Sequence, residues 1–390
     1  FRRVLFRSSE SKTVSLLLAI LTMITWGTNK IAVKYLTYPV SLYTIDFFAW
    51  VFIFHTLMSL TLGAGWFGNS SEDTFRNIMD VFHQGWKDAL YKIGGPFLAG
   101  ATTMGFTLIM FVLVDGYGLT SAIPLLFGTS MLLGVVIVFF MEGKKGDPLY
   151  IFVGVAVLFV AVILNTIASN MNQKCQEKKQ SSEKKEEVTV PLTEEPEKKL
   201  STTTFIILGL SAALCDVFYA PCTAMGNKDP IPLSPYGIFQ VVSLASFVCV
   251  FPFAYIVMRH PLKGDKCTFS DWIHATWKQR WPAIWSAFLL ALGNWGYASA
   301  GSQLGFAIGY ALSRGTLLVS ALLGVFVYRE FNGADAKTWA VQIAALYLFF
   351  AAILLEAMAK CLVCCEYTRW LVYPWMWVWC ILFEKENTKQ

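Results

Sequence analysis

The sequence predicts an all-α integral membrane protein with ten transmembrane helices, arranged as two inverted five-helix repeats. Three observations support this fold class. The chain is 56% hydrophobic and only 15% charged, whereas soluble domains are roughly 25% charged. The apolar residues gather in blocks of about 20 residues, the length that crosses a bilayer as a helix. One strongly charged segment divides these blocks five and five.

The first half of the chain, residues 13–170, contains five apolar blocks. We expect each block to be a helix, because an open strand would leave backbone N–H and C=O groups without partners in lipid. The blocks lack the period of two that is typical of a membrane β-barrel, so the pattern favours helices. The blocks are residues 13–35, 42–64, 93–114, 117–141 and 149–170.

Residues 171–200 separate the halves and contain seven Lys, seven Glu and no aromatic residue. Such a composition cannot bury a hydrophobic core, so the segment is predicted to be a disordered tether. The second half, residues 203–358, again contains five apolar blocks. These are residues 203–226, 235–258, 283–302, 305–328 and 338–358.

The two halves resemble each other in sequence. SMLLGVVIVFFMEG at 130–143 aligns with SALLGVFVYREFNG at 320–333, an offset of 190 residues. An odd number of spans in each half would give the halves opposite orientations in the membrane. Inverted repeats are a recurring plan of secondary transporters, which bind substrate between the repeats near the midplane.

The two ends are set apart from the membrane part. Residues 1–12 form an N-terminal segment in which 1–9 resemble sequencing-adaptor read-through, and are a candidate for non-native sequence. Residues 359–390 form a tail rich in Cys and Trp. Its apolar run at 370–383 is too short to span a bilayer.

Several function classes are disfavoured. The net charge of +5 gives no reason to propose a nucleic-acid partner. The chain has no G-x-x-x-x-G-K-[ST], H-E-x-x-H or G-x-S-x-G motif, so neither an ATP-driven motor nor a hydrolase is indicated. No cofactor or metal site is predicted, and the chain is not expected to be an enzyme.

Two charged residues lie deep inside predicted spans. Asp216 is fourteen residues into its block and Arg314 is ten residues into its own. A charge at the centre of a span costs roughly 2.5–3.5 kcal/mol on insertion, so it usually faces a cavity or a partner. The two side chains are at depths that would let them form an ion pair. Such a pair would either lock two helices together or take part in substrate binding or proton coupling; a snorkelling arginine is the third alternative.

The first block ends in ITWGTNKIAVKYL. The run from Gly27 to Asn29, next to Trp26, predicts a local break in the helix, and a broken helix is tolerated in the membrane only where it lines a cavity. Thr28, Asn29 and Lys30 are therefore candidate cavity residues. Lys30 could instead extend its side chain to the membrane surface.

Three further positions carry polar groups. Asn294 lies between Gly293 and Gly296, where it either binds a polar ligand beside Trp295 or serves close helix packing. Gln303 is a weaker candidate for ligand binding. Asp46 lies early in the second block and is either interfacial or involved in proton coupling.

Two segments carry a resemblance to a known group. They are WGTNKIAVKYL with SLYTIDFFAWVFIFHTLMSLTLG near the start, and RWPAIWSAFLLALGNWGYASAGSQLGFAIGYALSRGTLLVSALLGVFVYREF near the end. These segments resemble the plant-type ureide permeases of the drug/metabolite transporter superfamily, to which glucose/ribose porters are related. The central segment lacks the phosphate-loop-like motif of that group. At the position of Arg314 the group has a neutral amide, and a cation there would suit a more anionic substrate.

The resemblance implies a proton-coupled importer of small nitrogen heterocycles such as allantoin or uracil, working by alternating access in the plasma membrane. Protons and the lipid bilayer would be its partners beside the substrate. Asp216 and Asp46 are then candidates for proton coupling. The candidate substrate-binding residues are Trp26, Thr28, Asn29, Lys30, Asn294, Trp295, Gln303 and Arg314.

Two other functions stay open. In a sugar or nucleotide-sugar carrier of the same superfamily, Arg314 and Lys30 would bind hydroxyl groups or phosphate. In a non-transporting membrane scaffold or receptor, Asp216 and Arg314 would form a purely structural lock, and the tether would be a docking segment.

Overall fold

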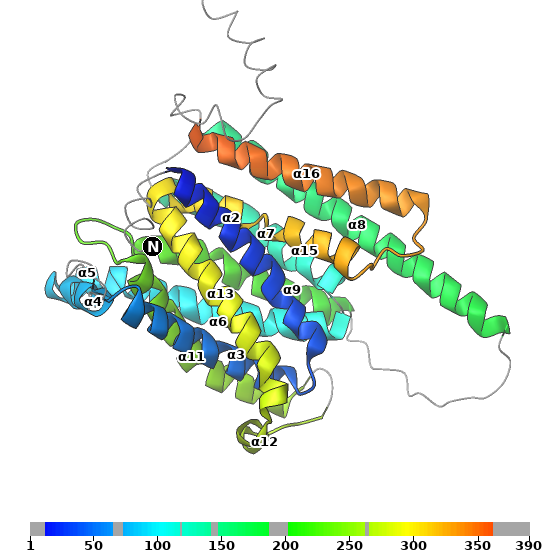
Figure 1. Ribbon diagram of the computed structural model, residues 1–390, viewed down its shortest axis with the longest axis horizontal. Helices are drawn as coiled ribbons and strands as arrows, with labels where there is room; N and C mark the ends of the chain where they lie inside the picture. The colour runs from blue at the N-terminus through cyan, green and yellow to red at the C-terminus, as the bar shows by residue number, and fades with distance from the viewer. Residues whose placement is uncertain are drawn as a thin grey trace, which may run out of the picture.

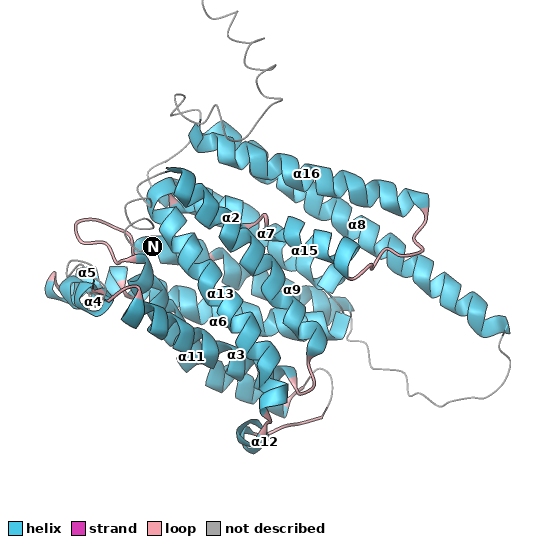
Figure 2. Ribbon diagram, viewed as in Figure 1, coloured by secondary structure: helices cyan, strands magenta, loops and turns pink. Residues whose placement is uncertain are grey.

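The computed structural model describes residues 12–64, 73–117, 119–141, 147–186, 202–261 and 265–361. Within these ranges every regular element is a helix (Figure 2). The predicted N-terminal segment before residue 12 and the predicted tail beyond residue 361 lie outside them.

The first half folds into a series of helices that follow the predicted blocks. They are α2 (Lys12–Thr28), the 3-10 helix η1 (Asn29–Tyr35), α3 (Val40–Thr61), α4 (Thr74–His83), α5 (Trp86–Lys92), α6 (Gly94–Tyr117), α7 (Leu119–Met141) and α8 (Pro148–Glu186). The second half contains α9 (Thr202–Val217), α10 (Tyr219–Met225), α11 (Pro235–Arg259), α12 (Phe269–His274), α13 (Trp277–Leu304), α14 (Phe306–Ser313), α15 (Thr316–Leu322), the π-helix η3 (Leu323–Val327) and α16 (Ala336–Cys361).

In the described part of the chain, eight helical stretches are long and apolar enough to cross a membrane, as an integral multi-pass protein requires. They are Val14–Val33, Val40–Thr61, Trp86–Val114, Pro148–Gln176, Thr203–Met225, Pro235–Arg259, Phe306–Val327 and Ala336–Met358. The other two predicted blocks are also helical: α7 has 23 residues and α13 has 28. That all ten cross the membrane, and that the halves are inverted, stay predictions.

Helix α8 differs from the prediction for the segment that joins the halves. It is 39 residues long and continues through residues 171–186, which we expected to be part of a disordered tether. The physical reason is that Gln, Lys and Glu have high helix propensity, and a helix already formed in the preceding span needs no new nucleus. The rest of the predicted tether, from residue 187, lies outside the described residues until 202.

The two halves interlock instead of forming separate bundles. Helix α2 packs along α13, α11 packs against both α3 and α6, and α7 packs against α9, so each contact joins a helix of the first half to one of the second. Helices α8 and α16 form a further pair across the halves and lie side by side along one edge of the molecule (Figure 1). Space enclosed by the central helices is therefore bounded by both halves.

The contact between α2 and α13 depends on small residues. A Cβ at Gly293 would lie 2.4 Å from Cδ1 of Trp26, and one at Gly296 would lie 2.7 Å from Oγ1 of Thr22. The Thr22 hydroxyl donates to the carbonyl oxygen of Gly293 at 3.0 Å. The glycines thus let the helices approach closely, as small residues at a helix contact do, and a ligand-binding role for Asn294 stays a prediction.

Candidate functional site

Three helices of the central bundle are interrupted at nearly the same place. Helix α2 gives way to η1 at Asn29, α9 and α10 are separated at Phe218, and α14 ends before Arg314 while α15 begins at Thr316. The break predicted at the end of the first block is therefore confirmed. The charged residues singled out in the sequence, Lys30, Asp216 and Arg314, all lie within two residues of these breaks.

Backbone groups freed at a helix break need new partners in a membrane. Side chains from the second half supply them at the end of α2. The Ser320 hydroxyl donates to the carbonyl oxygen of Gly27 at 3.2 Å, and the Ser286 hydroxyl donates to that of Asn29 at 2.8 Å. These bonds fix the broken end of α2 against α13 and α15.

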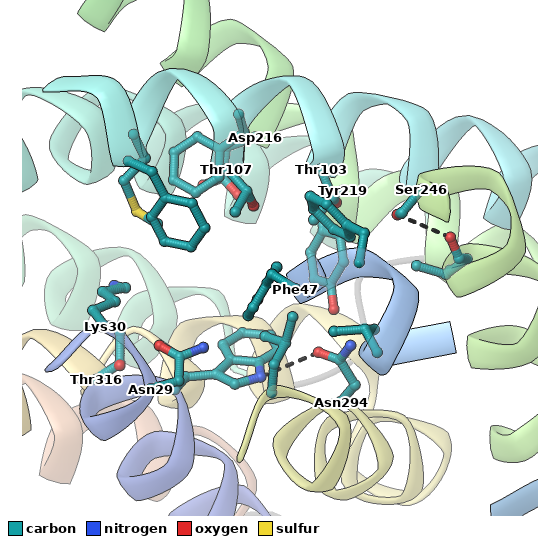
Figure 3. A pocket seen from close by; sticks show the side chains of 18 of the residues that line it. Asn29, Lys30, Phe47, Thr103, Thr107, Asp216, Tyr219, Ser246, Asn294 and Thr316 are labelled. Atoms are coloured by element: carbon teal, nitrogen blue, oxygen red, sulfur yellow. Dashed lines mark hydrogen bonds between the residues drawn. The ribbon is translucent and has the colours of Figure 1, made fainter. Parts of the chain in front are cut away.

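A cavity lies at the breaks, between the two halves (Figure 3). It contains about 750 Å³ of space not filled by protein atoms, including space open to solvent. About half of its lining residues are aromatic or aliphatic, and the others carry polar or charged side chains. The lining residues are Trp26, Asn29, Lys30, Phe47, Phe48, Val51, Thr103, Phe106, Thr107, Met110, Phe111, Phe127, Asp216, Tyr219, Val242, Ser243, Ser246, Leu290, Asn294, Arg314 and Thr316.

Asp216 and Arg314 form an ion pair at the wall of this cavity. Nη2 of Arg314 lies 2.5 Å from Oδ2 of Asp216. The same oxygen accepts a hydrogen bond from the Ser130 hydroxyl at 2.7 Å and one from Tyr310 at 3.5 Å. Arg314 also donates to the Tyr310 hydroxyl, and its guanidinium lies 5.1 Å from the ring centroid of Phe127. The predicted pairing of the two buried charges is thus confirmed.

Lys30 is buried in the same cavity rather than extended to the membrane surface. Its side chain is only 7% exposed, and Nζ lies 4.0 Å from the ring centroid of Phe127. This cation–π contact stabilises an ammonium group away from water. Among the described residues, no carboxylate forms a salt bridge with it.

An aromatic group beside Trp26 forms another part of the wall. The Trp26 ring lies 5.9 Å from that of Tyr219 and 5.6 Å from that of Tyr297, measured between centroids. Its indole N–H donates to Oδ1 of Asn294 at 3.2 Å, the bond drawn at Asn294 in Figure 3. This bond orients the amide at the cavity surface and brings together Trp26 and Asn294, two of the candidate substrate-binding residues.

Five buried polar atoms at the cavity lack hydrogen-bond partners among the described residues. They are Oδ1 of Asn29, Oγ1 of Thr103, Oη of Tyr219, Nε of Arg314 and Oγ1 of Thr316. Buried polar groups in native proteins are almost always paired, so several unpaired ones around one cavity indicate a polar occupant. Asn29, Lys30 and Thr316 are on the same side of the cavity in the view of Figure 3.

Three predicted substrate-binding residues do not line the cavity. The hydroxyl of Thr28 donates to the carbonyl oxygen of Ile24 at 2.9 Å, within its own helix. The ring of Trp295 stacks on Tyr236 with a centroid separation of 6.4 Å. Gln303 is exposed near the end of α13.

Asp46 belongs to a different cluster, near the beginning of α3. Its carboxylate accepts hydrogen bonds from Tyr38 at 2.7 Å, from the Trp272 indole at 2.8 Å and from Arg280 at 2.5 Å. Burial, and then the charge of Asp46, raises the pKa of Tyr38 well above its usual range, so Tyr38 remains a donor. The cluster joins the first half to α12 and α13, and Asp46 does not line the cavity.

Three residues at or behind the cavity wall escaped the sequence analysis. Ser130 and Tyr310 hold the ion pair, and Phe127 lies against both cations. Tyr310 could have been found, because it lies one helical turn before Arg314 and therefore shares its face. Ser130 and Phe127 had no comparable signal, since serine and phenylalanine are common in membrane helices.

Comparisons with known proteins agree with this architecture. The chain is 22% identical over 336 residues to "Ureide permease 2" from Arabidopsis thaliana, which covers 74% of this chain and 82% of that relative. One solved crystal structure of a protein has a TM-score of 0.54, covering 90% of this chain and 99% of its own at 15% identity, and so shares the fold. No family model matches. The similarity to the permease indicates a membrane transporter rather than an enzyme.

Proposed function

We propose that this chain is a secondary active importer of small polar nitrogen heterocycles such as allantoin or uracil. It would work by alternating access, coupled to protons, in the plasma membrane. The observation that carries the proposal is the cavity at the three helix breaks, because broken helices around a site between two repeats are typical of secondary transporters. The similarity to a ureide permease supports the substrate class.

The chemistry of the cavity suits a small planar ligand. Ligand sites usually combine apolar walls with polar groups that orient the ligand. A ureide or pyrimidine presents alternating N–H and C=O groups at its edge and flat faces above and below. Asn29 and Asn294 would bind the edge, while the rings of Trp26 and Tyr219 would contact a face.

Asp216 is the candidate proton acceptor. As a carboxylate it accepts from Arg314, Ser130 and Tyr310, and protonation would remove its attraction for Arg314. The freed guanidinium would then shift toward the cavity, which lies beside it. Proton binding at Asp216 would in this way change the charged groups that the cavity wall presents to the substrate. A symporter requires such coupling between proton binding and substrate binding.

The test is uptake of radiolabelled allantoin and uracil into proteoliposomes that hold the purified protein, with an acidic outside imposed. We expect accumulation against the substrate gradient by the wild type. Asp216→Asn should abolish this accumulation but retain exchange of internal for external substrate, because the amide still accepts a hydrogen bond from Arg314 and carries no titratable proton.

Sugars and nucleotide sugars serve as competing substrates in the same vesicles. Accumulation of either, without uptake of ureides or pyrimidines, would replace the proposed substrate class. Proton-driven accumulation by Asp216→Asn equal to that of the wild type would remove Asp216 from the coupling mechanism.

A further inference from the structure

The charges around the cavity do not balance. Among the described residues that line it, three are acidic or basic: Lys30, Asp216 and Arg314. Asp216 and Arg314 neutralise each other at 2.5 Å. Among the described residues, Lys30 forms no salt bridge with a carboxylate, and its Nζ lies 4.0 Å from the ring centroid of Phe127. In its protonated form, Lys30 gives the site as a whole an excess of one positive charge.

An unpaired buried charge is unfavourable, and a ligand of opposite charge would relieve the cost. A neutral heterocycle would leave the ammonium group of Lys30 uncompensated in the cavity. A ligand with one negative charge would make the loaded site neutral overall. Charge balance thus favours a monoanion over the neutral ring.

The polar groups on the same side of the cavity as Lys30 indicate which functional groups the anion would carry. Oγ1 of Thr316 and Nε of Arg314 lack partners, and each can donate a hydrogen bond. Oδ1 of Asn29 also lacks a partner and can only accept one. Figure 3 shows Lys30, Thr316 and Asn29 on the same side of the cavity. A cation with a donor hydroxyl matches a carboxylate, and the neighbouring acceptor matches an N–H group.

We propose that the preferred substrate is a planar nitrogen heterocycle with a carboxylate beside a ring N–H. Lys30 and the Thr316 hydroxyl bind the carboxylate, and Oδ1 of Asn29 accepts a hydrogen bond from the ring N–H. This inference rests on the proposed transport of nitrogen heterocycles and specifies which of them the site selects.

Uracil and orotate form a matched pair of probes. Orotate is uracil with a carboxylate on the ring carbon next to N1–H, so the two share every other group. The measurement is isothermal titration calorimetry of each probe with the full chain in nanodiscs. We expect orotate to bind the wild type about tenfold or more tightly than uracil, the ratio typical of a charge-assisted hydrogen bond.

Lys30→Met should remove this preference, lowering orotate affinity by about tenfold or more while changing uracil affinity much less. Lys30→Arg keeps the charge and should retain the preference for orotate. Lys87→Met is the matched control, because it deletes the same charge from an exposed lysine on α5, outside the cavity. It should leave both affinities at the wild-type values.

Tighter binding of uracil than of orotate by the wild type would overturn the inference and leave the proposed function standing. An equal loss of orotate and uracil affinity in Lys30→Met would also overturn it, since Lys30 would then not bind the carboxylate of orotate. If Lys30→Met does not fold, the wild-type ratio and Lys30→Arg decide the question. Binding of nucleotide sugars with no binding of either probe would overturn the proposed function itself.

Discussion

Arg314 is a permanent cation within a candidate membrane span, and its neighbours explain how the fold accommodates it. The guanidinium meets the carboxylate of Asp216 and the hydroxyl of Tyr310, and it lies over the rings of Tyr310 and Phe127 at 4.2 and 5.1 Å. Each of these contacts replaces part of the hydration that the charge loses. Removing only one member of such a buried pair leaves the other charge uncompensated.

We therefore expect Arg314→Gln to destabilise the protein by about 3–5 kcal/mol, the usual cost of breaking a buried ion pair from one side. The double variant Arg314→Gln with Asp216→Asn should recover much of that loss, because two amides can hydrogen-bond without charge. Melting temperatures of the purified variants in one detergent measure both effects.

A double variant as unstable as Arg314→Gln alone would contradict this account, because the cost would then not arise from an orphaned Asp216. Arg280→Gln is a useful comparison. It breaks the Asp46 ion pair, in which Asp46 keeps Tyr38 and Trp272 as donors, and should cost less.

At this scale the sequence predicted the ion pair because each charge in a span needs a partner, and only one acid and one arginine lay at matching depth. It failed for Thr28. Successive helical residues turn by about 100°, so residues next to one another in sequence face different sides. Thr28 turns back onto its own helix while Asn29 and Lys30 enter the cavity. The aromatic walls could not be selected from a chain with 15% aromatic residues.

At the scale of elements, the contact between α2 and α13 determines the shape of the cavity wall. Trp26 is held between Gly293, which leaves room for the indole, and Asn294, which accepts its hydrogen bond. A side chain at Gly293 would enter the space of the indole and of the Thr25 hydroxyl, at 2.4 and 2.5 Å. The position of an aromatic cavity residue thus depends on a glycine in another helix.

Gly293→Ala should therefore destabilise the protein by about 1–3 kcal/mol, as overpacking of a well-packed contact does. It should also weaken substrate binding, because Trp26 must move. Thermal melting measures the loss of stability, and titration of the protein with substrate measures the change in affinity.

Gly105→Ala is the matched control for this substitution. Gly105 lies within α6, and a Cβ there would meet its nearest neighbour, Sγ of Cys215, at an ordinary 3.8 Å. This variant should be as stable as the wild type or more so, since alanine favours helix by about 1 kcal/mol over glycine. Equal destabilisation by both substitutions would argue against a special role for the Gly293 contact.

Helix positions were predictable because blocks of about 20 apolar residues leave few alternatives in a membrane. Helix ends were less predictable. The run of Lys and Glu after residue 170 has the composition of a disordered chain, but the same residues favour helix once a preceding turn exists. Composition alone could not decide between the two, and α8 continues to Glu186.

At the scale of the whole molecule, α12 lies at one end of the bundle (Figure 1), where several side-chain contacts join the halves. The Asp46–Arg280 ion pair joins α3 to α13, and the Trp272 indole of α12 donates to the same carboxylate. Close by in the chain, Oγ of Ser41 lies 3.3 Å from Sγ of Cys267. Alternating access at this end would require these contacts to separate.

A covalent link at this position tests that requirement. Ser41→Cys introduces a thiol next to the native Cys267, and a disulfide needs the sulfur atoms to approach to about 2.05 Å. We expect oxidation to join the halves and to stop uptake into proteoliposomes, and a reductant to restore it.

The control is Ser41→Cys combined with Cys267→Ser, which should transport equally in oxidising and reducing conditions. Mass spectrometry of the oxidised single variant establishes that the link has formed. Undiminished uptake by the linked protein would mean that this end of the bundle does not separate during transport.

The placement of the cavity charges in different halves has a consequence for closure of the transporter without substrate. Lys30 belongs to η1 of the first half, whereas Arg314 and its partner Asp216 belong to the second. Closing the halves around an empty cavity would seal a lone ammonium group away from water, near a second cation. Closing them around a bound anion would not. If the halves move against each other during transport, this separation of the charges would discourage closure without substrate and so couple each closure to a molecule carried.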